Sequence, residues 1–180
     1  MDFTETTISS QTVFSGNVFQ VKVDKVKLPD KRESTREIVK HPGGVTMLPL
    51  TVDNKIIMVK QYRKAVEEVL LELPAGKLEE KEEPVECVQR ELEEETGYRA
   101  GSVKKIISFY TSPGYSNEIL HLFLGQDLKF TTKNPDKDEF VETEIIEKNQ
   151  IMNLIFRGKI KDSKTIIGLL YFLRGDFNVK

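Results

Sequence analysis

One stretch of the chain, GKLEEKEEPVECVQRELEEETGY from Gly76 to Tyr98, constrains the fold more than any other. Pro84 suits the first turn of a helix, where its missing N–H is not needed. Gly97 suits the left-handed position just after a helix. The stretch therefore predicts a helix of about three turns between these two residues.

The predicted helix carries an apolar side next to an acidic side. Residues three and four apart are neighbours on a helix, and an apolar stripe at that spacing faces a core. The apolar side is formed by Val85, Val88 and Leu92. The acidic side is formed by Glu91, Glu94 and Glu95.

Gathering carboxylates on one side of a helix costs free energy. Two of them about 6 Å apart repel by roughly 3 kcal/mol at an effective dielectric near 20. The last turn of a helix also disfavours negative charge. A divalent cation such as Mg²⁺ would reverse both penalties, because hard cations take carboxylate oxygens. The alternative is a solvated acidic face, and the flanking Gly76, Arg90 and Gly97 favour the metal site.

The same stretch resembles the Nudix box, G-x5-E-x7-R-E-U-x-E-E-x-G-U, in which U is a bulky apolar residue. The fixed positions are filled without gaps by Gly76, Glu82, Arg90, Glu91, Leu92, Glu94, Glu95 and Gly97. Tyr98 stands at the final U, where an aliphatic residue is more usual. The resemblance implies a Nudix hydrolase, which cleaves a nucleoside diphosphate linked to another group.

Composition narrows the partners and the compartment. The chain has 180 residues and a net charge of −2, so no basic field attracts nucleic acid or a membrane surface. Its single cysteine, Cys87, excludes an intrachain disulfide and is expected to be a packed side chain. Neither a membrane span nor a secretory signal is evident. We therefore expect a cytoplasmic protein with no nucleic acid and no membrane partner.

The pattern of apolar residues and turns predicts an α+β fold, and the resemblance implies its form, an α/β/α sandwich with a mixed β-sheet. The first ten residues are polar and suit a loose segment or an edge strand. Residues 42–44, Pro-Gly-Gly, mark a boundary between an N-terminal antiparallel β region at 1–42 and a Nudix hydrolase domain at 43–180. Strands are expected at 18–28, 35–41, 45–52, 56–62, 69–73, 103–111, 119–124 and 140–146, the seventh of them buried on both faces. Helices are expected around 151–155 and from Ser163, as its cap, to Gly175.

A second resemblance narrows the substrate. Pro113 lies fifteen residues beyond the box, a spacing typical of the ADP-ribose pyrophosphatase branch. Segments similar to that branch are VKQYR at 59–63, ELPAGKLE at 72–79, YTSPGYSNE at 110–118 and DEFVE at 138–142. The resemblance implies Mg²⁺-dependent cleavage of ADP-ribose to AMP and ribose 5-phosphate, with Mn²⁺ as a substitute. It also implies a homodimer formed through the N-terminal β region.

The resemblance also implies roles for single residues. The expected metal ligands are the carbonyl of Ala75 and the side chains of Glu91 and Glu95. Arg90 is expected to brace these carboxylates, and Glu94 is the next candidate. Glu139 is expected to be the general base or an additional metal ligand, because it follows a polar loop at 131–138 that could close over substrate. Glu142 is the alternative base, although it lies within a strand pattern.

Other residues are expected to contact substrate. Arg63 follows a predicted strand, and its guanidinium suits a bidentate contact with diphosphate oxygens, with a surface arginine as the alternative. Ser112, Pro113, Gly114 and Glu118 lie in the loop that the family uses around the terminal ribose. Arg36 and Glu37 fall where relatives contact the adenosine part.

Two further functions stay open. The same machinery would serve another nucleotide sugar or an oxidised nucleotide. A protein of another class, a sensor that binds ADP-ribose without cleaving it, would need no cluster of charges from Arg90 to Glu95. The intact cluster therefore favours an enzyme.

Overall fold

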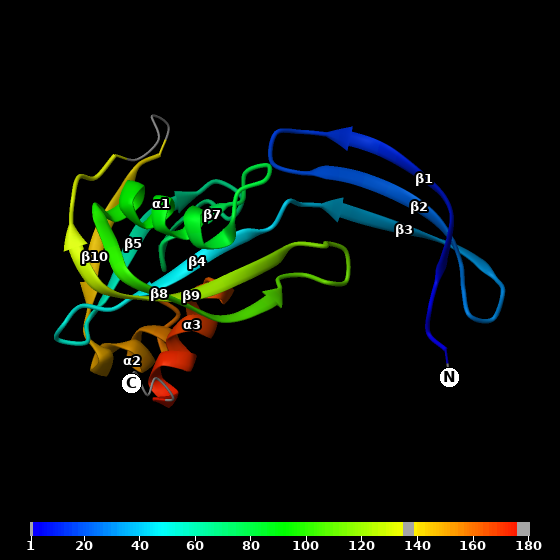
Figure 1. The fold of residues 1–180 in the computed structure, drawn as a ribbon. Helices are drawn as coiled ribbons and strands as arrows, with labels where there is room; N and C mark the ends of the chain where they lie inside the picture. The colour runs from blue at the N-terminus through cyan, green and yellow to red at the C-terminus, as the bar shows by residue number, and fades with distance from the viewer. Residues whose placement is uncertain (1, 135–138, 176–180) are drawn as a thin grey trace. The chain divides into compact units, whose positions relative to one another are not determined.

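The computed structural model describes residues 2–134 and 139–175, and the chain divides into two compact units (Figure 1). Unit 1 comprises Met1–Gly43 and Tyr110–Ile119, and unit 2 comprises Gly44–Phe109 and Leu120–Lys180. The second half of the predicted polar loop, including Asp138, lies outside the described residues.

Unit 1 is built on a three-stranded antiparallel sheet in the order β1–β2–β3. Its strands are β1 (Thr6–Ser15), β2 (Gln20–Lys27) and β3 (Glu33–Lys40). Strands β2 and β3 form a hairpin across a turn in which Lys31 adopts a φ of 72°. Strand β1 pairs along its whole length despite its polar sequence, because backbone hydrogen bonds do not depend on side-chain polarity. Of the two expectations for the first residues, the edge strand is confirmed from Thr6 onward.

The segment at 110–119 is attached to strand β3 within unit 1. The Val39 N–H donates to the Tyr115 carbonyl at 2.7 Å, and the Val39 carbonyl accepts from the Asn117 N–H at 3.2 Å. The Asn117 side chain in turn accepts from the His41 N–H at 2.8 Å. A loop that is distant in sequence therefore joins the N-terminal sheet.

Unit 2 contains two sheets, in the orders β10–β5–β6 and β7–β4–β9–β8. The first holds β10 (Val141–Ile146), β5 (Ile56–Arg63) and β6 (Glu68–Glu72). The second holds β7 (Ala75–Lys77), β4 (Gly44–Pro49), β9 (Ile119–Phe130) and β8 (Tyr98–Tyr110). Strands β4 and β9 are parallel, whereas β4 and β7 are antiparallel, so the sheet is mixed as predicted.

Helices cover both faces of these sheets. Helix α1 (Pro84–Thr96) lies on one side, and α2 (Ile151–Phe156) and α3 (Ser163–Arg174) lie on the other (Figure 1). The core under α1 contains Val45, Met47, Val88, Leu92 and Phe123. The core under α3 contains Leu48, Leu122, Leu124, Leu169 and Phe172. Neighbouring residues of β4 and of β9 thus face opposite cores, which confirms both the strand buried on two faces and the α/β/α sandwich.

The ends of the helices follow the sequence closely. Pro84 begins α1, and Gly97 ends it with a φ of 77°. Val85 was expected in the core but is 45% exposed, because it lies in the first turn and lines an open pocket. The cap of α3 is Asp162 rather than Ser163, since the Asp162 carboxylate accepts the Thr165 N–H at 2.9 Å.

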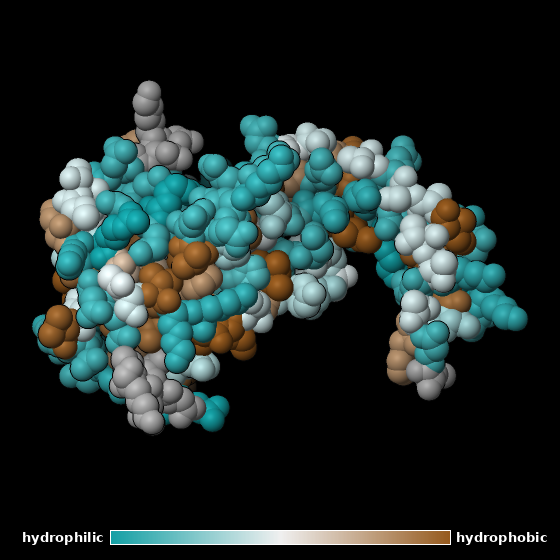
Figure 2. Space-filling view, viewed as in Figure 1, coloured by the Kyte–Doolittle hydropathy of each residue, from teal (hydrophilic) through white to brown (hydrophobic). Residues whose placement is uncertain are grey.

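The surface is mainly hydrophilic on the side shown in Figure 2, with apolar patches scattered among charged side chains. The helices within residues 2–134 and 139–175 are all too short or too polar to span a bilayer.

Candidate functional site

Helix α1 presents two buried carboxylates toward strand β7. Glu91 is 9% exposed and Glu95 is 2% exposed. The Ala75 N–H donates to Oε2 of Glu95 at 3.1 Å. A Cβ atom on Gly76 would lie 1.9 Å from Cδ of Glu91, so the missing side chain leaves room for that carboxylate. The structure therefore brings the three predicted ligand residues Ala75, Glu91 and Glu95 together.

Burial raises the pKa of both carboxylates. The pKa of Glu91 rises to about 7, because burial and the Glu94 charge outweigh the opposing charge of Arg90. The pKa of Glu95 rises to about 8, because burial is reinforced by the charges of Glu91 and Glu139. Two buried acids that resist ionisation next to each other suit a hard divalent cation, which would stabilise both charged forms.

Arg90 holds the acidic side of the helix in place. Its Nε and Nη2 donate to the two oxygens of Glu82 at 2.9 and 3.2 Å. Its Nη1 donates to Glu94 at 2.9 Å and lies 2.9 Å from Oε1 of Glu91. The fork on Glu82 lowers the pKa of that carboxyl to about 2. Arg90 therefore contacts three carboxylates, Glu91 and Glu94 on the helix and Glu82 before it.

Cys87 is a packed side chain rather than a reactive thiol. It is fully buried, and burial together with the Glu82 charge raises its thiol pKa to about 12. At neutral pH the thiol therefore stays protonated and a poor nucleophile.

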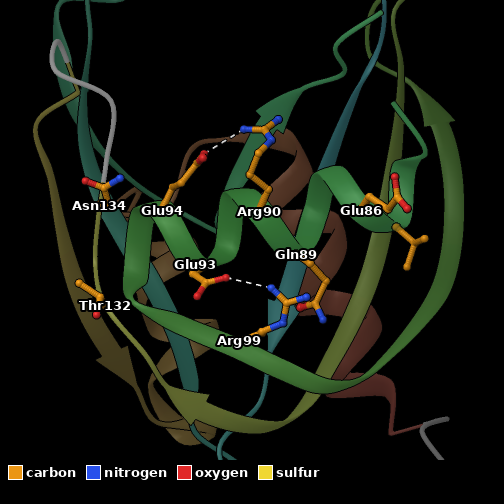
Figure 3. A pocket seen from close by; sticks show the side chains of 9 residues that line it. Glu86, Gln89, Arg90, Glu93, Glu94, Arg99, Thr132 and Asn134 are labelled. Atoms are coloured by element: carbon orange, nitrogen blue, oxygen red, sulfur yellow. Dashed lines mark hydrogen bonds and ion pairs between the residues drawn. The ribbon is translucent and has the colours of Figure 1, made fainter. Parts of the chain in front are cut away.

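A pocket of about 580 Å³, lined mainly by polar and charged residues, lies along α1 (Figure 3). Figure 3 shows two ion pairs at its wall, Arg90 with Glu94 and Arg99 with Glu93. Its lining residues are Val85, Glu86, Gln89, Arg90, Glu93, Glu94, Arg99, Thr132 and Asn134. The buried carboxylates Glu91 and Glu95 do not line it, although Arg90 at its wall lies 2.9 Å from Glu91.

Glu139 lies within electrostatic reach of that pair. It precedes strand β10, which contacts helix α1. Its charge contributes to the raised pKa of both Glu91 and Glu95, although burial is the larger cause. Glu142 lies within β10, opposite Lys60 of β5. The structure thus couples Glu139 electrostatically to the buried acids.

Arg63 has a partner that the sequence did not reveal. Its Nε and Nη2 donate to the two oxygens of Glu72 at 2.9 and 2.8 Å. Glu72 is 1% exposed, whereas 40% of the Arg63 side chain remains exposed. One feature of the sequence points to this contact: Glu72 is a charged residue between two apolar residues, Leu71 and Leu73, which are both buried. Such a carboxylate needs a cation.

The remaining predicted substrate contacts belong to unit 1. Arg36 donates from Nε to Glu5 at 2.9 Å, and Glu118 accepts from the Thr111 hydroxyl at 2.6 Å. Unit 1 contains Arg36, Glu37, Ser112, Pro113, Gly114 and Glu118. Unit 2 contains Arg63 and the residues of the acidic helix. The structure therefore divides the predicted contacts between the two units.

Across the part of the chain that the structure describes, no three side chains of His, Cys, Asp or Glu form a ready-made metal cluster. The fit to a cation rests on two buried carboxylates and one backbone carbonyl.

Comparison with known proteins shows the family. The chain matches the NUDIX domain over residues 40–167, and the N-terminal domain of nucleoside diphosphate sugar hydrolases over residues 5–39. The chain therefore belongs to the Nudix hydrolase family. A solved structure described as an ADP compounds hydrolase has the same fold, with a TM-score of 0.84, 20% identity and 97% coverage of both chains.

Three similar proteins carry different names. An ADP-ribose pyrophosphatase of Bacillus subtilis is 46% identical over 93% of this chain and 91% of its own length. A methanol dehydrogenase activator of Bacillus methanolicus is 45% identical over 94% of this chain and 92% of its own length. A GDP-mannose pyrophosphatase of Yersinia enterocolitica is 34% identical over 77% of this chain and 78% of its own length.

Proposed function

We propose that this protein hydrolyses the diphosphate bridge of ADP-ribose to AMP and ribose 5-phosphate in the presence of Mg²⁺. The observation that carries the proposal is the pair of buried carboxylates, Glu91 and Glu95, beside the backbone of Ala75 and Gly76. The high identity to an ADP-ribose pyrophosphatase over nearly the whole chain supports the choice of substrate.

The residues of the site fit a hard divalent cation. The carbonyl of Ala75 and the carboxylates of Glu91 and Glu95 would hold Mg²⁺, with Glu139 as a further ligand and Mn²⁺ as a substitute. When bound, the cation supplies positive charge that offsets the charge of the diphosphate. Arg90 keeps the acidic helix face in place through Glu82 and Glu94.

The chemistry requires one proton acceptor. Water attacks a phosphorus of the bridge, the bond from that phosphorus to the bridging oxygen breaks, and the leaving phosphate keeps that oxygen. We assign Glu139 as the base that accepts the proton of the attacking water. Its charge is already coupled to Glu91 and Glu95, which supports a position close to them.

Substrate contacts are proposed for both units. Arg63 would contact the diphosphate, because Glu72 accepts from its Nε and Nη2 and 40% of the Arg63 side chain stays exposed. In unit 1, Arg36 and Glu37 would contact the adenosine part. The terminal ribose would be contacted by Ser112, Pro113, Gly114 and Glu118.

Unit 1 supports a homodimer. It exposes apolar side chains on β1 and on the turn between β1 and β2, and β1 has a free edge, since it pairs only with β2 among the described strands. These side chains include Ile8, Val13, Phe14, Val18 and Phe19, which are between 40% and 54% exposed. A second copy would cover them. Light scattering after gel filtration should give twice the monomer mass.

A panel of substrates tests the activity. Purified protein is incubated with ADP-ribose, ADP-glucose, GDP-mannose and 8-oxo-dGTP, with and without Mg²⁺, and the products are chromatographed. AMP from ADP-ribose alone supports the proposal. Products from GDP-mannose or ADP-glucose would favour a broader nucleotide-sugar hydrolase, and binding without turnover would favour a sensor. Glu95→Gln should abolish Mg²⁺ activation, whereas Glu93→Gln, which changes an ion pair with Arg99, should not.

A further inference from the structure

A buried group of charges lies at the start of helix α3, apart from the acidic face of α1. Lys164 is 8% exposed, and its ammonium contacts Oε2 of Glu72, which is 1% exposed. The same ammonium lies 3.0 Å from the Asp162 carboxylate, which caps the helix. Lysine is almost never this deeply buried without a specific partner.

Helix α3 is fixed against the end of strand β6 at this point. The Leu73 N–H donates to the Thr165 hydroxyl at 2.9 Å. A Cβ atom on Gly168 would lie 2.6 Å from Cδ1 of Leu73, so glycine allows the close approach of helix and strand. These two contacts fix the position of the first turn, and with it the direction in which Lys164 reaches Glu72.

Glu72 contacts both Lys164 and Arg63, and so links helix α3 to Arg63. Both oxygens of Glu72 accept from the Arg63 guanidinium, which leaves Nη1 outside the fork. Burial opposes the charge of Glu72, but the contacts with Arg63 and Lys164 outweigh it and lower its pKa. The chain of contacts therefore runs from Lys164 of α3 through Glu72 to the Arg63 guanidinium.

We propose that Lys164 is a positioning residue for catalysis, which acts through Glu72 to hold the Arg63 guanidinium where it binds the diphosphate of the substrate. The inference rests on the role proposed above for Arg63. Helix α3 would then contribute to substrate binding. An arginine without a fixed partner loses side-chain entropy when it binds substrate, and the contact with Glu72 reduces that loss.

The first test compares two lysines of the same region. Lys164→Met removes the buried ammonium but keeps most of the aliphatic stem. Lys161→Met is the matched control, because Lys161 is half-exposed and pairs with the half-exposed Glu68. We expect Lys164→Met to raise KM roughly tenfold, with kcat and the Mg²⁺ requirement within about twofold of wild type. Lys161→Met should match wild type, since exposed ion pairs contribute little.

A double variant covers the case in which Lys164→Met fails to fold. Glu72→Gln combined with Lys164→Met removes both members of the buried ion pair, and the Arg63 side chain that loses its partner is 40% exposed. It should fold and still show the raised KM, because Arg63 has lost its bidentate partner. A wild-type KM in this folded double variant would overturn the proposal.

Coupling to Arg63 separates positioning from a general structural role. In an Arg63→Lys background, Lys164→Met should change KM by less than about twofold, because the guanidinium that it positions is already absent. An undiminished tenfold effect in that background would show that Lys164 acts elsewhere, and would refute the inference.

The KM comparison uses whichever diphosphate substrate the panel identifies. Turnover of GDP-mannose but not ADP-ribose would overturn the proposed substrate and leave the role of Lys164 testable. Equal KM values for Lys164→Met and Lys161→Met would overturn the inference and leave the substrate standing. Turnover of no substrate would overturn both.

Discussion

The carboxylate of Glu91 occupies the space that a side chain at position 76 would need. A Cβ atom on Gly76 would stand 1.9 Å from both Cδ and Oε1 of Glu91. The clash falls on the flexible end of a side chain, so Glu91 is the group that would move. The glycine at the start of the box and the glutamate on its helix therefore form one structural unit.

Gly76→Ala should therefore impair the metal site more than the fold. We expect at least a tenfold rise in the Mg²⁺ concentration that gives half-maximal activity, since a displaced ligand loses most of its contribution. The free energy of unfolding should change by only about 1 kcal/mol. Activity against Mg²⁺ concentration and a thermal melt measure the two effects. Gly101→Ala is the control, because its Cβ would meet only Asp127, at 3.0 Å. Unchanged Mg²⁺ activation in Gly76→Ala would remove Glu91 from the proposed site.

Arg90→Lys tests the brace on the acidic helix. A lysine carries the charge but lacks the planar fork that holds both oxygens of Glu82. We expect a loss of about 1–2 kcal/mol in unfolding free energy and roughly a tenfold fall in kcat. Arg99→Lys, at an exposed pair with Glu93, should stay within about 0.5 kcal/mol. Equal effects of the two substitutions would mean that Arg90 contributes only a surface charge.

Local signals in the sequence predicted the acidic helix well. Pro84 and Gly97 mark its ends because their backbone preferences act without help from the rest of the fold. Val88 and Leu92 face the core because spacing alone places them on the same side. The resemblance to the Nudix family, and the α/β/α sandwich that it implies, are confirmed by the family match and the fold.

Contacts between distant residues could not be predicted in this way. Glu72 of β6 contacts Arg63 of β5 and Lys164 of α3. The local sequence around each of these residues does not indicate which residue it contacts. Val85 repeats the spacing of the core residues, but it lies where the first turn lines an open pocket. Periodicity gives the direction of a side chain, and the tertiary fold decides what it meets there.

The raised pKa values of Glu91 and Glu95 predict an unusual pH dependence of stability without metal. The folded values are about 7 and about 8, against a reference of 4.5. Between pH 4.5 and these folded pKa values, the two carboxyl groups are still protonated in the folded protein but already ionised in the unfolded chain. Stability therefore falls as pH rises through this range, and the favourable contribution is complete only below about pH 4.5.

Thermal melts in a chelator, from about pH 5 to pH 8.5, should show this fall, with roughly 2–4 °C lost for each kcal/mol. Glu95→Gln should flatten the slope, because it removes the more strongly shifted group. Saturating Mg²⁺ should raise the melting temperature more at pH 8 than at pH 6, since the cation displaces the protons. The same slope in wild type and Glu95→Gln would contradict the assignment of the buried acids.

The proposed base gives the most direct kinetic prediction. Glu139→Gln keeps the shape of the side chain but removes its ability to accept a proton from the attacking water. We expect kcat to fall by about 10²–10⁴ with little change in KM, as for a group that acts in the transition state. Glu142→Gln is the comparison, because Glu142 lies three residues further on, in strand β10, where it pairs across from Lys60.

The two variants together decide which carboxylate acts. If Glu142→Gln loses turnover and Glu139→Gln keeps it, the base lies in the strand rather than before it. If the turnover of Glu139→Gln is restored at high pH, where hydroxide replaces water, Glu139 acts in proton transfer rather than in metal binding. Loss that is restored only by more Mg²⁺ would instead make Glu139 a ligand, because added cation compensates for a weakened site but does not supply a base.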